Sequence, residues 1–323
     1  MIRHLLKKAG QQTKAHMRNR WTILCWVLAS SFAQAQPATD ADLCRTMTNN
    51  PDLAIKLCTT AIETGKANSE MLSLLYVQRG SLWADKGDYD RAIADQSAAL
   101  KLNAKAPQAN YYRGAAWSNK GEFDRAIADF DAAIKIRSDD PVIYHARAIE
   151  LTVKGDYPRA ISDFDKALQL DAKAEGVHFA RGRTLFYMSD FARSASDLEA
   201  AFKAQPNIYT ALWLFLARKR GSNNDADYLL ERETRGIRGG WPSPIIALFL
   251  GRTDVNSIMV GATTSDSKRQ REMRCEANFY VAQAHLIKGE RPRAQMLLQE
   301  LQRSCPKNLL EYEAATAELR RLK

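Results

Sequence analysis

Small and apolar residues recur every 34 residues from Ser73 onward, with polar residues between them. Two sets of small residues lie twelve residues apart: Gly80, Gly114, Ala148 and Gly182, then Ala92, Ala126, Ala160 and Ser194. A larger set and a third small set follow at Gln96, Phe130, Phe164 and Leu198, then at Ala99, Ala133, Ala167 and Ala201. The small residues allow close helix approach, and the pattern predicts antiparallel helix pairs that bury their apolar faces only against neighbouring pairs.

This period and these residue types are the tetratricopeptide repeat (TPR) pattern. We therefore expect an all-α TPR superhelical solenoid, with four units over residues 73–208. Each turn carries a local signal, because a glycine can adopt the left-handed conformation that ends helix A and a carboxylate then favours the positive end of helix B. These pairs are Gly87-Asp88, Gly121-Glu122, Gly155-Asp156 and Gly289-Glu290.

Four arginines share the 34-residue period, and each precedes an aspartate by sixteen residues. The pairs are Arg79 with Asp95, Arg113 with Asp129, Arg147 with Asp163, and Arg181 with Asp197. Arginines in register would also suit an anion-binding strip, but the constant spacing to an acid favours structural pairing. We therefore do not predict a nucleic-acid surface.

The remaining chain divides around the four units. Residues 36–72 are expected to form a helical hairpin that caps the amino-terminal end. Residues 209–274 keep a helical pattern without the strict period, with a Gly- and Pro-rich loop from Arg235 to Pro244. Residues 275–323 are expected to form a last TPR-like unit and a capping helix over residues 308–322.

Residues 1–35 have the features of a secretory signal peptide. Arg18 and Arg20 precede an apolar run over residues 21–33, and Ala33-Gln34-Ala35 supplies a small-x-small cleavage site. The run is shorter than the roughly 20 residues of a membrane-spanning helix, and Leu24 before Cys25 breaks a lipidation motif. We expect translation to begin at Met17, and the product to be soluble, periplasmic or secreted, with no lipid anchor and no membrane span.

Removal of this segment changes the charge. The whole chain has 47 basic and 37 acidic residues, a net charge of +10. Six of the basic residues and none of the acids lie in residues 1–35, which leaves 41 basic and 37 acidic residues and a net charge of +4. A weakly positive surface favours protein partners over nucleic acid.

Four cysteines remain after the signal, and an even number in an exported protein suggests disulfides. Cys44 and Cys58 flank the turn at residues 49–51, while Cys275 opens and Cys305 closes the last unit. Both pairs fit antiparallel hairpins. A four-cysteine zinc site is the alternative, but the pairs lie at opposite ends of the predicted solenoid.

Helix geometry places a set of side chains on the inner surface of the solenoid, because residues i, i+3 and i+4 share one helical face. The set is Gln108, Tyr111, Ser118, Asn119, His145, Phe179, Arg183, Phe186 and Tyr187. Aromatic anchors beside polar donors suit a peptide-binding groove; in the alternative, Phe179 and Phe186 pack between repeats. The groove hypothesis predicts that Tyr111→Ala and Arg183→Ala weaken partner binding without changing the melting temperature.

Enzymatic motifs are absent from the sequence. The histidines after the signal, His145, His178 and His285, lie in helices A of three different units. The sequence contains no strand-turn-helix nucleophile motif and no phosphate-binding loop. We therefore predict a non-catalytic protein without cofactor or metal.

The irregular second half resembles a known family. The apolar run at residues 212–217, Trp241-Pro242, residues 246–251, Asn278-Phe279-Tyr280 and residues 308–319 follow in the order found in NlpI-like TPR lipoproteins of the bacterial cell envelope. The resemblance covers roughly residues 73–319 and implies a homodimeric envelope adaptor that brings a processing protease to peptidoglycan hydrolases. The missing lipidation motif and the Cys44–Cys58 hairpin depart from that family. An accessory of an export or polysaccharide system that binds a small ligand is the competing hypothesis.

Overall fold

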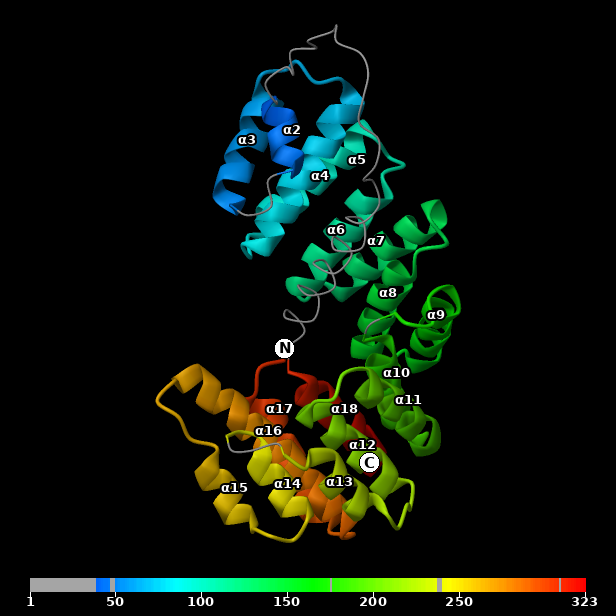
Figure 1. Ribbon diagram of the computed structural model, residues 1–323, viewed down its shortest axis with the longest axis vertical. Helices are drawn as coiled ribbons and strands as arrows, with labels where there is room; N and C mark the ends of the chain where they lie inside the picture. The colour runs from blue at the N-terminus through cyan, green and yellow to red at the C-terminus, as the bar shows by residue number, and fades with distance from the viewer. Residues whose placement is uncertain (1–38, 47–49, 175, 237–239, 308) are drawn as a thin grey trace, which may run out of the picture. The chain divides into compact units, whose positions relative to one another are not determined.

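The computed structural model describes residues 39–46, 50–174, 176–236, 240–307 and 309–323. Within these ranges the regular structure is entirely α-helical and the helices follow one another as antiparallel pairs (Figure 1). The all-α TPR solenoid is therefore confirmed. The signal segment lies outside the described residues. The chain forms two compact units, of which the first contains residues 39–150 and 167–174 and the second contains residues 151–166 and 176–323.

The first unit is a run of helical hairpins. Its helices are α2 (Asp40–Thr46), α3 (Pro51–Glu63), α4 (Ser69–Asp85), α5 (Tyr89–Leu102), α6 (Pro107–Asn119), α7 (Phe123–Ile136) and the greater part of α8 (Pro141–Lys154). Helices α4 and α6 are helices A, and α5 and α7 are their helices B. At Gly114 an added Cβ would lie 2.9 Å from Cε1 of Phe130 and 3.1 Å from the carbonyl oxygen of Ala126. Glycine is therefore required there by close approach of α6 to α7.

Two of the predicted arginine–aspartate pairs lie in the first unit and are formed. Arg79 donates from Nε and Nη2 to both carboxylate oxygens of Asp95 at 2.8 Å, and Arg113 makes the same two-bond contact with Asp129. The remaining nitrogen of each arginine reaches the preceding helix B, at Thr59 and Ser97 respectively. Each arginine thus joins its own hairpin to the one before it, which confirms structural pairing at these positions.

Helix α3 is equivalent to the helices B of the repeats, but the spacing to the next helix B is 38 residues and not 34. Its buried residues Ala54, Cys58 and Ala61 lie 38 residues before Ala92, Gln96 and Ala99 of α5. The contacts repeat at the same offset, because Arg79 contacts Thr59 of α3 as Arg113 contacts Ser97 of α5. Helix α4 has 17 residues and α6 has 13. This extra turn of helix explains the longer spacing.

The first disulfide lies at the centre of this amino-terminal hairpin. The sulfur atoms of Cys44 on α2 and Cys58 on α3 are 2.12 Å apart, and both residues are fully buried. Cys58 occupies the repeat position at which Gln96 and Phe130 pack against a glycine of helix A. The predicted pairing is confirmed, and it replaces a packing contact in a hairpin whose helix A has only 7 residues.

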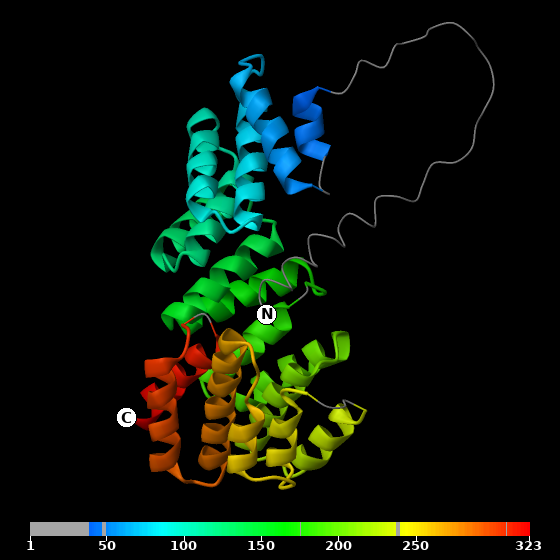
Figure 2. The same cartoon turned by 90° about the vertical axis from the view of Figure 1, so that its left-hand side faces the viewer.

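The second unit contains the irregular half of the chain. Its helices after the end of α8 are α9 (Tyr157–Leu170, of which residues 157–166 belong here), α10 (Val177–Tyr187), α11 (Phe191–Ala204), α12 (Ile208–Arg220), α13 (Ala226–Thr234), α14 (Ser243–Phe249), α15 (Val255–Gly261), α16 (Ser267–Ile287), α17 (Arg291–Ser304) and α18 (Leu310–Leu322). Helices α16 and α17 form an antiparallel pair (Figure 2). Their Cys275 and Cys305 are joined as predicted, with an S–S distance of 2.02 Å.

The core of this unit is built on α12. Residues 211–217 are all at most 1% exposed, and Trp213 contacts the rings of Phe186 and Phe279 at centroid distances of 5.5 and 5.4 Å. An all-apolar helix surface is buried on every side. Buried residues of α10, α11, α13, α16, α17 and α18 join those of α12 in a single hydrophobic cluster.

Candidate interaction face

Three helices A of the first unit carry a stripe of exposed and half-buried side chains. Residues spaced by four, three and four positions lie on one face of a helix. On α4, α6 and α8 these positions hold Leu74, Gln78, Ser81 and Asp85; Gln108, Tyr112, Ala115 and Asn119; and Val142, Ala146 and Ile149. We call this stripe the helix A face.

Large apolar side chains on the helix A face are exposed to solvent. Leu74 is 46%, Tyr112 36% and Val142 50% exposed. Leu74 and Val142 occupy the same repeat position, 68 residues apart. Aligned exposed apolar groups on one surface are typical of an interaction site rather than of a random solvent-facing helix.

Charge is nearly absent from the helix A face. Asp85, at the end of α4, is its one charged residue among the positions named above. Arg79 and Arg113 belong to the same helices but point toward their helices B, where Asp95 and Asp129 hold them. An uncharged surface selects a partner by apolar contact and neutral hydrogen bonds, and it does not select by charge.

Two of the residues expected from sequence lie on this face. Gln108 and Asn119 are exposed at opposite ends of α6. The Asn119 amide donates to the carbonyl oxygen of Ala115 at 2.8 Å. Both residues stay candidates for contacting a partner.

Tyr111, Ser118 and His145 lie at the edge of the face, between adjacent helices. Tyr111 packs on the ring of Phe130 at 5.9 Å, and burial raises the pKa of its phenol to about 12. Ser118 donates to Oε1 of Glu150 at 2.6 Å and so joins α6 to α8. Burial lowers the pKa of His145 to about 4, so its imidazole is neutral at pH 7.

The fourth repeat differs from the other three. Phe186 is 0%, Tyr187 4% and Arg183 7% exposed, while Phe179 is partly buried. Helix α18 covers them, and Glu313 of that helix accepts from Nη2 of Arg183 at 3.2 Å. Phe186 therefore packs in the core, which is the alternative that the sequence left open. The two residues Phe186 and Tyr187 belong to the core and do not line an open groove.

Leu74, Tyr112 and Val142 were missed by the sequence analysis. Helical spacing identified the neighbouring Tyr111 as an anchor, but that side chain turns between helices. An apolar residue recurs at the second position of the first and third units, as Leu74 and Val142, and this recurrence could have identified the exposed face from the sequence.

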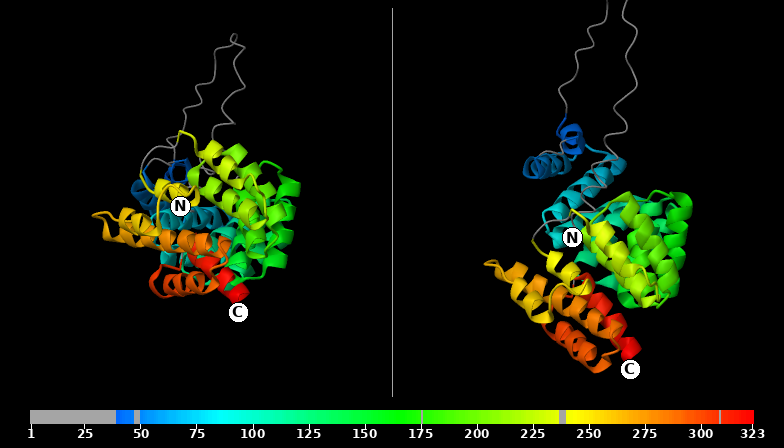
Figure 3. Two further views of the ribbon diagram at one scale, coloured as in Figure 1. Left: turned by 90° about the horizontal axis from the view of Figure 1, so that it is seen from below. Right: turned by 60° about the horizontal axis from the view of Figure 1, so that its bottom comes forward.

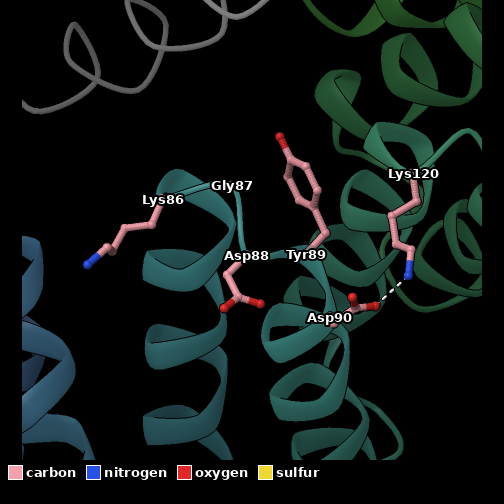
Figure 4. A pocket seen from close by; sticks show the side chains of 6 residues that line it. All are labelled: Lys86, Gly87, Asp88, Tyr89, Asp90 and Lys120. Atoms are coloured by element: carbon pink, nitrogen blue, oxygen red, sulfur yellow. Dashed lines mark hydrogen bonds and ion pairs between the residues drawn. The ribbon is translucent and has the colours of Figure 1, made fainter.

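A shallow depression lies at the turn between α4 and α5, lined by Lys86, Gly87, Asp88, Tyr89, Asp90 and Lys120 (Figure 4). Lys120 pairs with Asp90, and Lys86 points away from the depression and pairs with Asp52 of α3. Its cations therefore link consecutive hairpins. This arrangement serves the stacking of repeats and offers no set of converging catalytic groups.

The described residues carry neither a metal-binding cluster nor a membrane-spanning helix. In the part of the chain that the structure describes, no group of three or more His, Cys, Asp or Glu side chains could hold a metal ion. Over the same residues, no helix combines the length and the apolar character that crossing a bilayer requires. His178 and His285 pair with Asp197 and Glu290 of their own hairpins, at 2.9 and 2.7 Å.

The repeat geometry agrees with a family comparison. Residues 78–141 and 179–215 match the family model for the tetratricopeptide repeat. These segments are tetratricopeptide repeats. The matched TPR segments include α6 and the second half of α4, while Leu74 and Val142 of the helix A face lie just outside them. No curated protein matches the chain.

Solved TPR structures share this fold. YrrB, a TPR protein with an unusual peptide-binding site, superposes with a TM-score of 0.51 at 18% identity, over 61% of this chain and 98% of YrrB. The carboxyl-terminal part of a TPR protein from Cytophaga hutchinsonii gives 0.52 at 20% identity, over 84% and 97%. A TPR protein from Parabacteroides merdae gives 0.52 at 12% identity, over 88% and 95%. At these identities the likeness is one of fold.

Proposed function

We propose that this chain is a non-catalytic adaptor of the bacterial cell envelope that binds a protein or peptide segment on its helix A face. The observation that carries the proposal is the alignment of Leu74, Tyr112 and Val142, exposed on a surface almost without charge. Apolar anchors of this kind commonly dominate the free energy of binding. The peptide-binding site of YrrB, a protein of the same fold, supports the same mode of action.

The envelope location is supported by the two disulfides and by the signal-like residues 1–35. Disulfides of this type persist in oxidising compartments. The resemblance to NlpI-like proteins adds peptidoglycan hydrolases or a processing protease as the partner class, and a homodimer as the assembly.

The compartment is tested by amino-terminal sequencing of the protein purified from a bacterial host. We expect the mature chain to begin at Gln36, with an intact mass that contains no lipid. Retention of residues 17–35, or an acylated mass, would contradict export by signal cleavage.

The interaction is tested with an array of ten-residue peptides of graded charge and hydropathy, followed by affinity measurements on the best binder. We expect uncharged apolar peptides to bind, with affinity that changes little between 50 and 500 mM salt because no ion pair forms. Tyr112→Ala and Val142→Asp should each weaken binding at least about tenfold, or roughly 1.4 kcal/mol.

Ile136→Ala is the matched control. Ile136 is 40% exposed, between the values for Tyr112 (36%) and Val142 (50%), but it lies at the end of helix B α7. Binding should be unchanged in this variant. Equal loss in all three variants, or no loss in Tyr112→Ala and Val142→Asp, would reject the helix A face as the binding surface.

A further inference from the structure

Helix α18, the red helix at the carboxyl-terminal end in Figure 3, lies against α10, α16 and α17. Its buried side is built from small residues, Ala314, Ala315 and Ala317, followed by Leu319. Two carboxylates are buried on the same side, with Glu311 5% and Glu318 1% exposed. A helix with this composition is held by polar contacts as much as by apolar area.

Basic and amide groups of three helices meet the carboxylates of α18. Arg183 of α10 donates to Glu313 at 3.2 Å. Arg220 of α12 and Gln283 of α16 both donate to Oε1 of Glu318, at 3.0 and 3.1 Å. The surface beneath α18 therefore recognises two carboxylates five residues apart on one helix.

The fourth repeat is adapted to this contact. Arg183 stands where the first three repeats have Ser81, Ala115 and Ile149. In the same way, Phe186 replaces Ala84, Ser118 and Thr152. The fourth repeat, which packs against α18, thus has a charged residue and a large aromatic residue at these two positions.

Some buried polar atoms near the contact between α18 and its neighbours lack a hydrogen-bond partner. The buried Nε of Arg183 and the phenol oxygens of Tyr187 and Tyr280 have no protein hydrogen-bond partner in the described part of the chain. A buried polar group without a partner is destabilising. The free energy that holds α18 in place is therefore smaller than its buried area suggests.

The hairpin next to α18 is closed independently of it. The Cys275–Cys305 disulfide ties the middle of α16 to the end of α17, and α18 follows α17 in the chain and packs on both helices. Departure of α18 leaves the disulfide between α16 and α17 intact. The structure therefore allows α18 to leave while the rest of the unit stays folded.

We propose that the surface of α10, α12, α16 and α17 beneath α18 is a second, helix-binding site, and that α18 is its displaceable resident. The competing partner is an amphipathic helix with two carboxylates five residues apart, small residues between them, and a leucine after the second. While α18 is docked the site is closed, so α18 acts as an autoinhibitory segment. This site is separate from the helix A face, and its failure would leave the proposed function intact.

Hydrogen exchange of the full chain gives the first test. Amides of α18 should exchange at least about tenfold faster than those of α16 and α17, because local opening precedes global unfolding. Exchange of all three helices at one rate would overturn the proposal, since α18 would then be a permanent part of the core.

A labelled peptide of residues 309–323 gives the second test. It should bind at least tenfold more tightly to the Thr316→Pro variant than to wild type, because proline breaks the resident helix and leaves α10, α12 and α16 unchanged. The same peptide with Glu313→Ala and Glu318→Ala is the matched control and should not bind. Absence of binding to the variant, or unfolding of α16 and α17 in it, would also overturn the proposal.

Discussion

Replacing Arg183 by methionine is expected to lower the free energy of unfolding of the second unit by about 3–5 kcal/mol. Arg183 is 7% exposed and pairs with Glu313, whose side chain is 15% exposed. Its guanidinium also lies 5.5 Å from the ring of Phe179 and 5.9 Å from that of Trp213. The variant would leave Glu313 buried without its cation, which costs more than the pair contributes when intact.

The free energy of unfolding is measured in urea, with hydrogen exchange of the backbone amides of α10 and α16 as the probe. A local probe is needed because a chain of two units need not unfold in one step. Arg183→Met combined with Glu313→Gln should recover most of the loss. Arg193→Met is the matched control, since Arg193 and Asp190 are 57% and 36% exposed at 3.5 Å, and it should change stability by less than about 1 kcal/mol. A small effect of Arg183→Met alone would contradict this expectation and show that Glu313 is hydrated or protonated once its cation is removed.

This expectation corrects the one drawn from sequence. There, Arg183→Ala was expected to weaken partner binding and leave melting near wild type. The structure places Arg183 under α18, where its removal changes stability before it changes any surface. Loss of binding in such a variant would therefore be no evidence for a groove.

The second unit should lose stability on the order of 3 kcal/mol between pH 5 and pH 8 through Glu311 alone. Burial, and after it the nearby charge of Glu276, raises the pKa of Glu311 from 4.5 to about 7. A carboxyl whose pKa is raised by folding binds its proton more tightly in the folded state. Its stabilising contribution is therefore complete below its unfolded pKa and is lost as the pH rises through about 7.

Several groups face Glu311 from the helices around it. The cation Arg183 of α10 lowers its pKa, and Glu313 of α18 raises it. Tyr187 and Tyr280 are buried phenols whose own pKa values are raised by burial. Burial also raises the pKa of Glu276, which accepts from Tyr209 at 3.1 Å and Trp241 at 2.6 Å and pairs with Arg269.

Comparison of Glu311→Gln with wild type isolates this one carboxyl, because the other groups are present in both proteins. The variant should be more stable than wild type at pH 8, with a difference that vanishes toward pH 5. Glu300→Gln, on the exposed side of α17, should follow the wild-type profile. Parallel pH profiles for Glu311→Gln and wild type would show that Glu311 reaches solvent.

The repeat architecture was predictable because its signals are local and recur. Gly114 and Phe130 mark a close approach of two helices joined by one short turn, and the arginine-to-aspartate spacing repeats within each hairpin. The cysteine pairs followed from the same logic, since both partners of each pair lie in a single hairpin. Contacts between residues close together in the chain can therefore be predicted from the sequence.

At the amino-terminal hairpin, the 34-residue period led to a wrong assignment of α3. One extra turn in α4 shifts the spacing from 34 to 38 residues. A search at fixed period therefore ends at Ser73, and α3 looks like a separate cap. The contacts of Arg79 with Thr59 and Asp95 reveal it as the preceding helix B.

By itself, the sequence determined the helix pairs, their turns, the ion-pair ladder and the two disulfides, because each depends on residues close together in one hairpin. Only the tertiary structure decided which inner positions are open. Tyr112 is exposed while Tyr111 turns inward, and Phe186 is buried because α18, over a hundred residues later in the chain, packs beside it. Helical periodicity assigns a side chain to a face, but it contains no information on which distant segment covers that face.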